Sequence, residues 1–176
     1  MPPVVCFLGK KKSGKTTVTV AVAAELTRRG RRVMTVKHGH GFDLDREGTD
    51  SWRHVHEGGA QRVVLAGPDE FAVLGSWPDG QPVGPEALAQ RFLADADIVL
   101  VEGFRNEPLP CIEIYRRAAH VDPVFPFGAP EWGRYIAMAT DVVGLDAPFP
   151  VLDVDAPDLA ARLADIIERE TSLGPE

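Results

Sequence analysis

Short apolar runs recur along this chain, separated by polar or glycine-rich segments. Several of them, such as VVCFL at 4–8 and DIVLV at 97–101, are continuous rather than alternating. Continuous runs of this length are typical of strands that are buried on both faces of a parallel sheet. The pattern predicts strands at 4–8, 32–36, 61–66, 71–76, 97–101, 111–115, 135–139 and 149–154.

Between these runs the apolar residues follow a helical period. Val18, Val22 and Leu26 recur every four residues, and Gly30 follows where such a helix would end. Pro85 suits the first turn of another helix, and Asp50 is the candidate N-cap of a short one. The sequence predicts helices at 14–29, 50–57, 85–94 and 158–169.

The predicted strands and helices alternate along most of the chain. This order favours a three-layer α/β fold, in which helices cover both faces of a mostly parallel central sheet. No repeat, low-complexity tract or long linker divides the sequence. We therefore expect a single domain over residues 1–176, a size that suits one buried core.

Composition limits the binding partners and the cellular location that can be expected for this protein. The 176 residues carry a formal net charge of -7, which argues against a general nucleic-acid binder. No segment approaches the ~20 apolar residues of a membrane span or resembles a signal peptide. Cys6 and Cys111 lie in apolar runs and are expected to be buried free thiols. We expect a cytoplasmic protein that binds neither nucleic acid nor membrane.

The segment GKKKSGKT carries the most specific chemistry. The phosphate-loop spacing G-x(4)-G-K-T is matched by Gly9, Gly14, Lys15 and Thr16. A strand before this motif and a helix after it are its usual context. In such a loop the backbone N–H groups, here including those of Lys12 and Ser13, form an anion nest beside the helix N-terminus. The lysine neutralises the β- and γ-phosphates, and the hydroxyl binds Mg²⁺.

These features predict a P-loop NTPase fold that binds a purine nucleoside triphosphate. The run from Lys10 to Lys12 within the loop has two interpretations: it strengthens the attraction for phosphate, or it is simply solvated.

A second apolar strand ends in a carboxylate, in the sequence DIVLVEG. Glu102 has the position of a Walker B acid, which faces the phosphate loop and reaches Mg²⁺ or its water. The alternative is an ordinary acid at a strand end. We favour the metal role, in which Glu102 and Thr16 lie on the same ion.

The segment 37–60 is dense in His, Asp and Gly and follows a predicted strand. Loops at the carboxyl edge of an open α/β sheet bind ligands, so Asp43 and Asp45 are candidates to hold Mg²⁺. His38 and His40 are candidates to contact phosphate. A sharper alternative is a transition-metal site, and the plainer one is solvated loop histidines. The possible nitrogen ligands would be His38, His40, His54 and His56.

Two further residues are candidates by position alone. Asp141 follows a late strand, where a carboxylate can accept hydrogen bonds from N1 and N2 of guanine, although a cap or turn role explains it equally well. Arg105 follows Glu102 closely and is a candidate to contact phosphate or a cofactor.

Four blocks of this sequence together resemble one family, the molybdopterin-guanine dinucleotide biosynthesis protein B (MobB) family. They are GKKKSGKTT, VKHGHGFDLDREGTDSWRHVHEGGA, DIVLVEGFRNEPLPCIEIYR, and YIAMATD followed by VLDV and a helix. The resemblance implies a homodimeric GTP-binding accessory protein with weak GTPase activity. Its partner would be the molybdenum cofactor guanylyltransferase, which joins GMP to molybdopterin, and molybdopterin itself is a candidate ligand.

By the same resemblance, the phosphates and Mg²⁺ are handled by Gly14, Lys15, Thr16 and Thr17. Lys15, Asp45 and Glu102 would be the catalytic group, with Thr16, Asp45 and Glu102 at the metal, and Asp141 would recognise guanine.

The sequence also departs from the family pattern. KHGHG at 37–41 replaces the usual KHTHH, the triple lysine is atypical, and Met138 and Ala139 take the first two positions of the NKxD signature of many GTPases. Two other functions therefore stay open, namely a small-molecule kinase or ligase and a metallochaperone GTPase.

Overall fold

The computed structural model describes residues 1–39, 41, 44–77, 83–126 and 133–173. His40 and Asp43, which were candidate ligands, lie outside these residues. The chain divides into two compact units. The first unit comprises Met1–His38 and Gly84–Glu176, and the second comprises Gly39–Val83. The expectation of a single domain stays a prediction.

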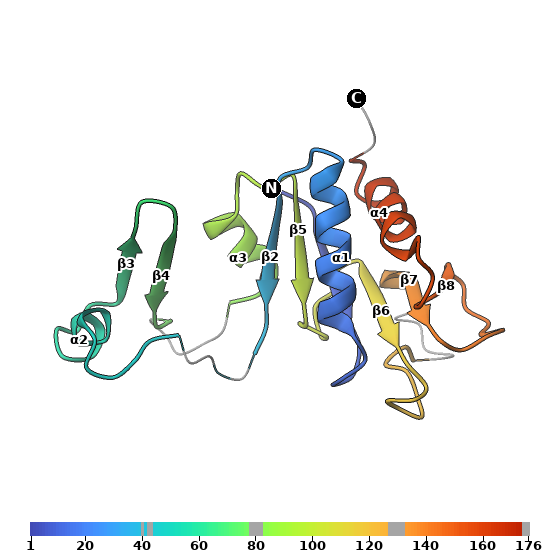
Figure 1. The fold of residues 1–176 in the computed structure, drawn as a ribbon, viewed down its shortest axis with the longest axis horizontal. Helices are drawn as coiled ribbons and strands as arrows, with labels where there is room; N and C mark the ends of the chain where they lie inside the picture. Colours follow the sequence, from blue (N-terminus) through green and yellow to red (C-terminus); the bar gives the residue numbers. More distant parts are fainter. Residues whose placement is uncertain (40, 42–43, 78–82, 127–132, 174–176) are drawn as a thin grey trace. The chain divides into compact units, whose positions relative to one another are not determined.

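A six-stranded sheet in the order β2-β5-β1-β6-β7-β8 forms the centre of the first unit (Figure 1). Every pair of neighbouring strands is parallel, which confirms the predicted parallel sheet. The strands are β1 (Val4–Leu8), β2 (Val33–Lys37), β5 (Ile98–Glu102), β6 (Cys111–Tyr115), β7 (Tyr135–Thr140) and β8 (Val151–Asp153).

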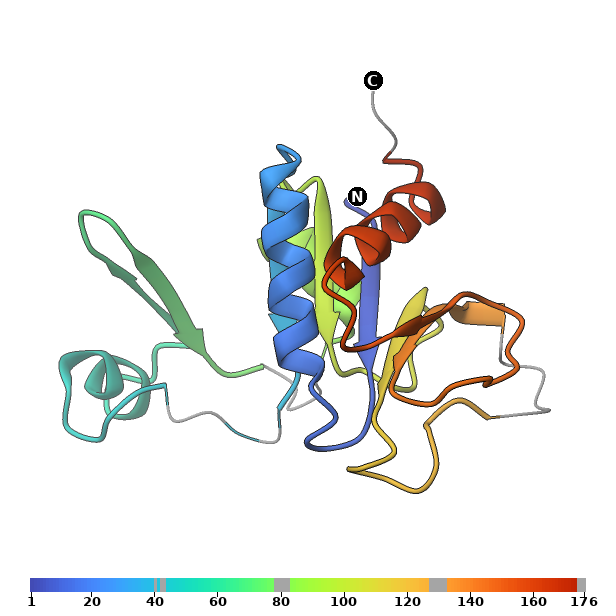
Figure 2. The same ribbon diagram turned by 45° about the vertical axis from the view of Figure 1, so that its right-hand side comes forward.

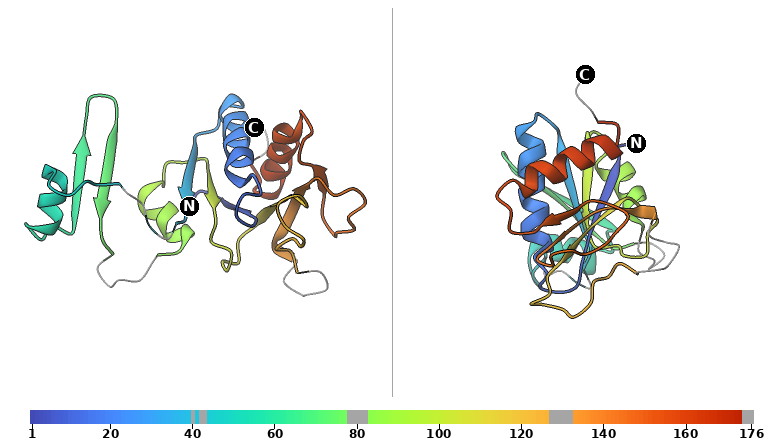
Figure 3. Two further views of the ribbon diagram at one scale, coloured as in Figure 1. Left: turned by 60° about the horizontal axis from the view of Figure 1, so that its bottom comes forward. Right: turned by 90° about the vertical axis from the view of Figure 1, so that its right-hand side faces the viewer.

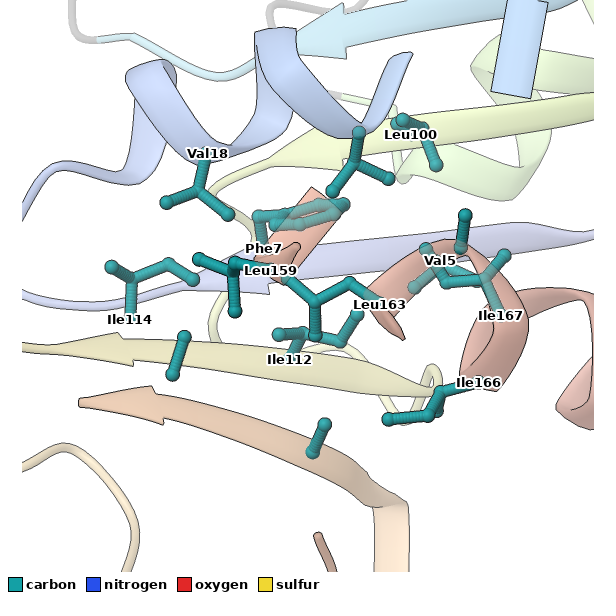
Figure 4. Close-up of a cluster of buried hydrophobic side chains, with 14 of the residues drawn as sticks. Val5, Phe7, Val18, Leu100, Ile112, Ile114, Leu159, Leu163, Ile166 and Ile167 are labelled. Atoms are coloured by element: carbon teal, nitrogen blue, oxygen red, sulfur yellow. The ribbon is translucent and has the colours of Figure 1, made fainter. Parts of the chain in front are cut away.

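Two helices cover one face of this sheet: α1 (Lys15–Arg28) and α4 (Leu159–Glu170) stand side by side there (Figure 2). The predicted four-residue stripe of α1 is buried, and the apolar stripe of α4 packs into the same cluster. In Figure 4, Val18 of α1 and Leu159 and Leu163 of α4 lie around Phe7 of β1. This core fixes the start of α1 relative to the end of β1.

The opposite face is covered by α3 (Pro85–Phe92) and by the segments that connect the strands (Figure 3). One of these is the stretch after β6, which is rich in prolines and aromatics of the kind common in surface loops. Phe125 is nevertheless only 5% exposed and packs edge-on against Tyr135 and Phe149. A connecting segment can therefore replace a helix as the cover of a sheet.

The second unit contains α2 (Asp50–His56) and an antiparallel hairpin of β3 (Arg62–Ala66) and β4 (Phe71–Gly75). Thr49, rather than Asp50, is the N-cap of α2 and accepts a hydrogen bond from the Trp52 amide. The strands were predicted, but they do not join the parallel sheet. Within the described ranges, no helix is both long and apolar enough to cross a bilayer.

Candidate functional site

The predicted phosphate loop connects β1 to α1 and requires its glycines. Gly9 has a φ of +144°, and a Cβ there would lie 2.4 Å from the Ile114 carbonyl oxygen. Gly14, the N-cap of α1, has a φ of +93°. Both conformations exclude ordinary side chains, and both glycines let the backbone turn closely around a ligand. The strand–loop–helix context of the motif is thus confirmed.

Two side chains of the loop, those of Lys15 and Ser13, have surroundings that suit a bound phosphate. The Lys15 ammonium donates a hydrogen bond to the Lys10 carbonyl at 2.8 Å, across the loop. Burial lowers the pKa of Lys15, and Glu102 opposes that shift. The Ser13 hydroxyl is buried without a hydrogen-bond partner in the described structure. A buried polar group without a partner costs free energy, so this cradle favours an oxygen-rich ligand.

Glu102 lies beside Thr16, as the Walker B interpretation predicts. It ends β5, where Phe7 of β1 and Lys37 of β2 are its register partners. The Thr16 hydroxyl donates to the Glu102 carboxylate and lies 2.9 Å from each of its oxygens. The hydroxyl of Thr16 and the carboxylate are hard oxygen donors, which suit Mg²⁺.

Lys37 completes this arrangement and was not among the predicted site residues. Its ammonium lies 3.1 Å from both oxygens of Glu102 and 3.4 Å from the Thr16 hydroxyl. It therefore occupies the place of a cation between the two oxygen donors. Strand register is the signal that would have found it, because the ends of β2 and β5 are neighbours in the sheet.

Asp45 belongs to the second unit and is engaged in a local network. Its Oδ1 accepts hydrogen bonds from the hydroxyls of Thr49 and Ser51, each at 2.9 Å, and from the Arg46 amide at 3.0 Å. Thr49 is itself the cap of α2. The geometry thus gives Asp45 a role at the start of this helix, and its role at a metal stays a prediction.

The histidines of the same region have separate surroundings. His38 lies in the first unit, where its ring is 4.7 Å from that of Phe104. Gly103, with a φ of +105°, leaves room for it, since a Cβ there would lie 2.8 Å from the His38 Cβ. His56 stacks on Trp52 in the second unit. Among the described residues no group of three or more His, Cys, Asp or Glu side chains could hold a metal.

Asp141 follows β7 and lines a cavity of about 530 Å³ with residues of the turn after β7, of β8 and of the turn after β8. Its carboxylate accepts a hydrogen bond from the Arg117 amide at 2.8 Å. Asp155, on the same cavity, forms a two-pronged ion pair with Arg116 at 2.7 and 3.0 Å. Arg116 also approaches the loop, since its Nε lies 3.8 Å from where a Cβ on Gly14 would be. Sequence analysis did not single out Arg116.

The remaining predicted residues, together with His120, lie in several parts of the first unit. Lys12 and Thr17 are exposed, and Lys12 has a φ of +66° within the loop. His120 contacts the Lys11 carbonyl at 2.5 Å. Arg105 lines a different cavity, after β5. Cys6 and Cys111 are buried free thiols, as predicted, and burial raises the pKa of each to about 12.

A parallel sheet, a phosphate loop between its central strand and a helix, and a strand-end acid on the Thr16 hydroxyl define the class of the phosphate-loop NTPase fold. The family model described as Molybdopterin guanine dinucleotide synthesis protein B, MobB, matches residues 4–141. The chain belongs to the MobB family.

Curated relatives agree with this assignment. The molybdopterin-guanine dinucleotide biosynthesis adapter protein of Haemophilus influenzae is 34% identical over 168 residues, which covers 94% of this chain and 88% of that protein. The protein of the same name from Escherichia coli is 31% identical over 121 residues, which covers 68% of this chain and 69% of that protein.

Solved structures support the fold. The crystal structure of Bacillus subtilis MobB matches with a TM-score of 0.67 and 19% identity, over 93% of this chain and 97% of that one. A crystal structure of molybdopterin-guanine biosynthesis protein B matches with a TM-score of 0.64 and 24% identity, over 96% and 99% of the two chains.

Proposed function

We propose that this protein is a GTP-binding accessory factor with slow GTPase activity in the synthesis of molybdopterin guanine dinucleotide. The observation that carries the proposal is the joining of a phosphate loop to the strand-end acid through the contact between Thr16 and Glu102. Membership of the MobB family supplies the pathway, since its description names the synthesis of that dinucleotide.

The phosphate end of the nucleotide would lie in the loop between Gly9 and Gly14. There Lys15 would exchange the Lys10 carbonyl for phosphate oxygens, and the Ser13 hydroxyl would gain a partner. Mg²⁺ would be held by the Thr16 hydroxyl and by Glu102 directly or through water, and it would take over the position of the Lys37 ammonium. When bound, the ion neutralises charge on the β- and γ-phosphates.

The guanine base would lie in the cavity of about 530 Å³ beside Asp141. One Asp141 oxygen already accepts the Arg117 amide, which holds the carboxylate in place for hydrogen bonds from N1 and N2 of guanine. Adenine offers no donor pair at those positions, so it would not make the hydrogen bonds to Asp141 that guanine makes, a difference of the kind that discriminates between ligands.

Slow turnover is proposed because Arg116, an arginine beside the loop, is already paired. Arg116 approaches Gly14, but its guanidinium is bound to Asp155 through two hydrogen bonds. An arginine that stabilises the transferred phosphoryl group is worth several powers of ten in rate. In this arrangement the charge of Arg116 is directed at a carboxylate, so rapid hydrolysis would need a partner that rearranges the site.

The test is a competitive calorimetric titration of GTP against ATP, with and without Mg²⁺. We expect GTP to bind at least tenfold more tightly than ATP, and Asp141→Asn to shift the preference from guanine towards xanthine nucleotides. Asp158→Asn, at the start of α4, is the matched control and should change neither affinity. Equal affinity for GTP and ATP, or an equal loss of both in Asp141→Asn, would count against base recognition by this residue.

We also propose that the protein acts as a homodimer whose partner enzyme is the molybdenum cofactor guanylyltransferase. The hairpin of β3 and β4 supports self-association, because it exposes large apolar side chains on an isolated two-stranded sheet. Such sheets are marginally stable alone. The exposed residues include Val64 at 62%, Phe71 at 77% and Val73 at 43%.

Replacement of these side chains tests the dimer. We expect Val64→Asp with Phe71→Asp to yield a monomer in light scattering, because charges are excluded from the core of an interface. Val143→Asp is the control, since Val143 is 99% exposed outside the hairpin. A doubly substituted protein that keeps the mass of the wild type would refute the role of the hairpin.

A further inference from the structure

A second cavity, of about 670 Å³, lies in the first unit and has no assigned ligand. Its described lining comes from residues 105–108 after β5, from Val124 and Pro126 after β6, and from residues 133–135 at the start of β7. None of these residues belongs to the phosphate loop or to the cavity beside Asp141. Its volume is within the range of small-molecule sites.

Arg134 provides a positive charge that is fixed at the wall of this cavity. Its Nη2 donates to the Arg105 carbonyl at 2.6 Å, and its Nη1 donates to the Glu107 carbonyl. Its guanidinium carbon also lies 5.3 Å from the centre of the Tyr135 ring. These partners are neutral, and within the described ranges Arg134 forms no ion pair. The guanidinium is therefore oriented without being neutralised.

Arg105 provides a second positive charge, on an exposed side chain. That side chain has neither a hydrogen bond nor an ion pair with any described residue. It acts at longer range on Glu113, whose pKa it helps to lower against the raising effect of burial. Glu113 is itself satisfied, since its carboxylate accepts the amides of Val124 and Phe125.

The charges of the lining favour an anion. Among the described lining residues, two guanidinium groups oppose the single carboxylate of Glu107. Asn106 adds an amide donor, whereas Pro108 and Pro126 supply apolar walls. Two arginines facing one space match the oxygens and the charge of a phosphate monoester, which carries about -1.5 to -2 at neutral pH. The apolar walls suit a flat organic body attached to that phosphate.

We infer that this cavity binds a pterin that carries a phosphate monoester, with Arg105 and Arg134 on the phosphate. The inference rests on the proposed function, in which a guanine nucleotide is joined to molybdopterin. A dinucleotide linkage joins two phosphates, so the pterin reactant must present a terminal phosphate. The guanine nucleotide has its own site at the phosphate loop, and the second cavity would place the other reactant on the same unit.

The experiment uses neopterin monophosphate as the probe, in calorimetry on the full chain saturated with a non-hydrolysable GTP analogue and Mg²⁺. We expect one equivalent to bind, and unphosphorylated neopterin to bind at least tenfold more weakly. Arg105→Gln should weaken the phosphorylated probe at least tenfold, while the affinity for the GTP analogue stays unchanged. Arg162→Gln, an exposed arginine on α4, is the matched control and should bind the probe like the wild type.

A second variant tests the cavity by shape rather than by charge. Val124→Phe fills part of the space and should weaken the probe without a change in charge. The inference is overturned if the probe fails to bind at about 1 mM, the limit of weak binding. It is also overturned if Arg105→Gln leaves the affinity for the probe unchanged, or if GMP competes for the cavity as well as the probe itself does. Probe binding that depends on Arg105, in a chain that does not bind the GTP analogue, would support the cavity and sink the proposed function.

Discussion

Glu102 and Asp45 were predicted to hold the same metal ion, yet they are engaged very differently. Glu102 ends the buried strand β5 and accepts the Thr16 hydroxyl and the Lys37 ammonium, which come from two other elements. Asp45 accepts its three hydrogen bonds from residues within six positions along the chain. One carboxylate joins distant segments, and the other organises the start of the helix that follows it in the chain.

The difference shows what fixes the position of an acid. The end of a central parallel strand is determined by the topology of the sheet, so a carboxylate there must face the loop that follows the neighbouring strand. An acid in a polar segment is surrounded by Ser, Thr and backbone donors, which compete for it locally. Composition alone does not distinguish the two cases.

The largest effect is expected from Lys15→Ala, which removes the charge at the centre of the site formed by the phosphate loop and Glu102. We expect the affinity for GTP to fall about 100-fold, or about 2.7 kcal/mol, because a charged hydrogen bond to phosphate is lost. Calorimetry measures the change, and circular dichroism should report an unchanged fold, since among the described residues the Lys15 ammonium donates a hydrogen bond only to the Lys10 carbonyl.

Lys11→Ala is the matched control for this substitution. Lys11 lies in the same loop with an exposed side chain, and it is the Lys11 backbone carbonyl that His120 approaches. Its loss should lower the affinity less than about threefold, as expected for a screened surface charge. Equal losses in both variants would mean that the loop attracts phosphate by its total charge and that Lys15 has no special position.

A smaller effect is expected from Glu102→Gln, which tests the strand-end acid directly. The amide keeps the size of the side chain and still accepts the Thr16 hydroxyl, but it loses the charge that attracts a cation. We expect Mg²⁺-dependent hydrolysis to fall about tenfold, as for other groups that support a metal, with GTP affinity in EDTA nearly unchanged. Phosphate release at a series of Mg²⁺ concentrations is the measurement, and an unaltered Mg²⁺ dependence would leave Glu102 a structural residue.

Much of the site formed by the phosphate loop and Glu102 could be predicted, because the sequence patterns that indicate it are local. The phosphate loop combines fixed spacing with glycines whose φ angles are positive, and β5 is a continuous apolar run. The hairpin strands were also predicted, but not their separation from the sheet. Strand propensity reports a pleated, partly buried environment and not the partner of a strand.

The residues that sequence analysis missed depend on contacts between distant segments. Lys37 acquires its position from the pairing of β2 with β5, and Arg116 from its bond to Asp155. Glu113 is fully buried in the middle of β6, where it accepts two backbone amides of the following segment. The partners of Lys37 and Arg116 lie 65 and 39 residues away along the chain. Those of Glu113 are backbone amides 11 and 12 residues away, which no residue type or spacing identifies.

The smallest effect is expected from Asp45→Asn, which tests the hydrogen-bond network around Asp45 at the start of α2. The amide oxygen still accepts hydrogen bonds, but the donors from Thr49 and Ser51 lose a charged acceptor. We expect the free energy of local opening of α2 to fall by about 1 kcal/mol, because a charged bond is replaced by a neutral one. Amide hydrogen exchange in α2 is the measurement, and protection in β5 should stay at the wild-type level.

Leu44→Asn, a substitution at an exposed neighbour, is the control. Unchanged protection of α2 would contradict the local role. A raised Mg²⁺ requirement for hydrolysis in the same variant would assign Asp45 to the metal. Asp45 and Glu102 would then share one function and differ only in their hydrogen-bond partners.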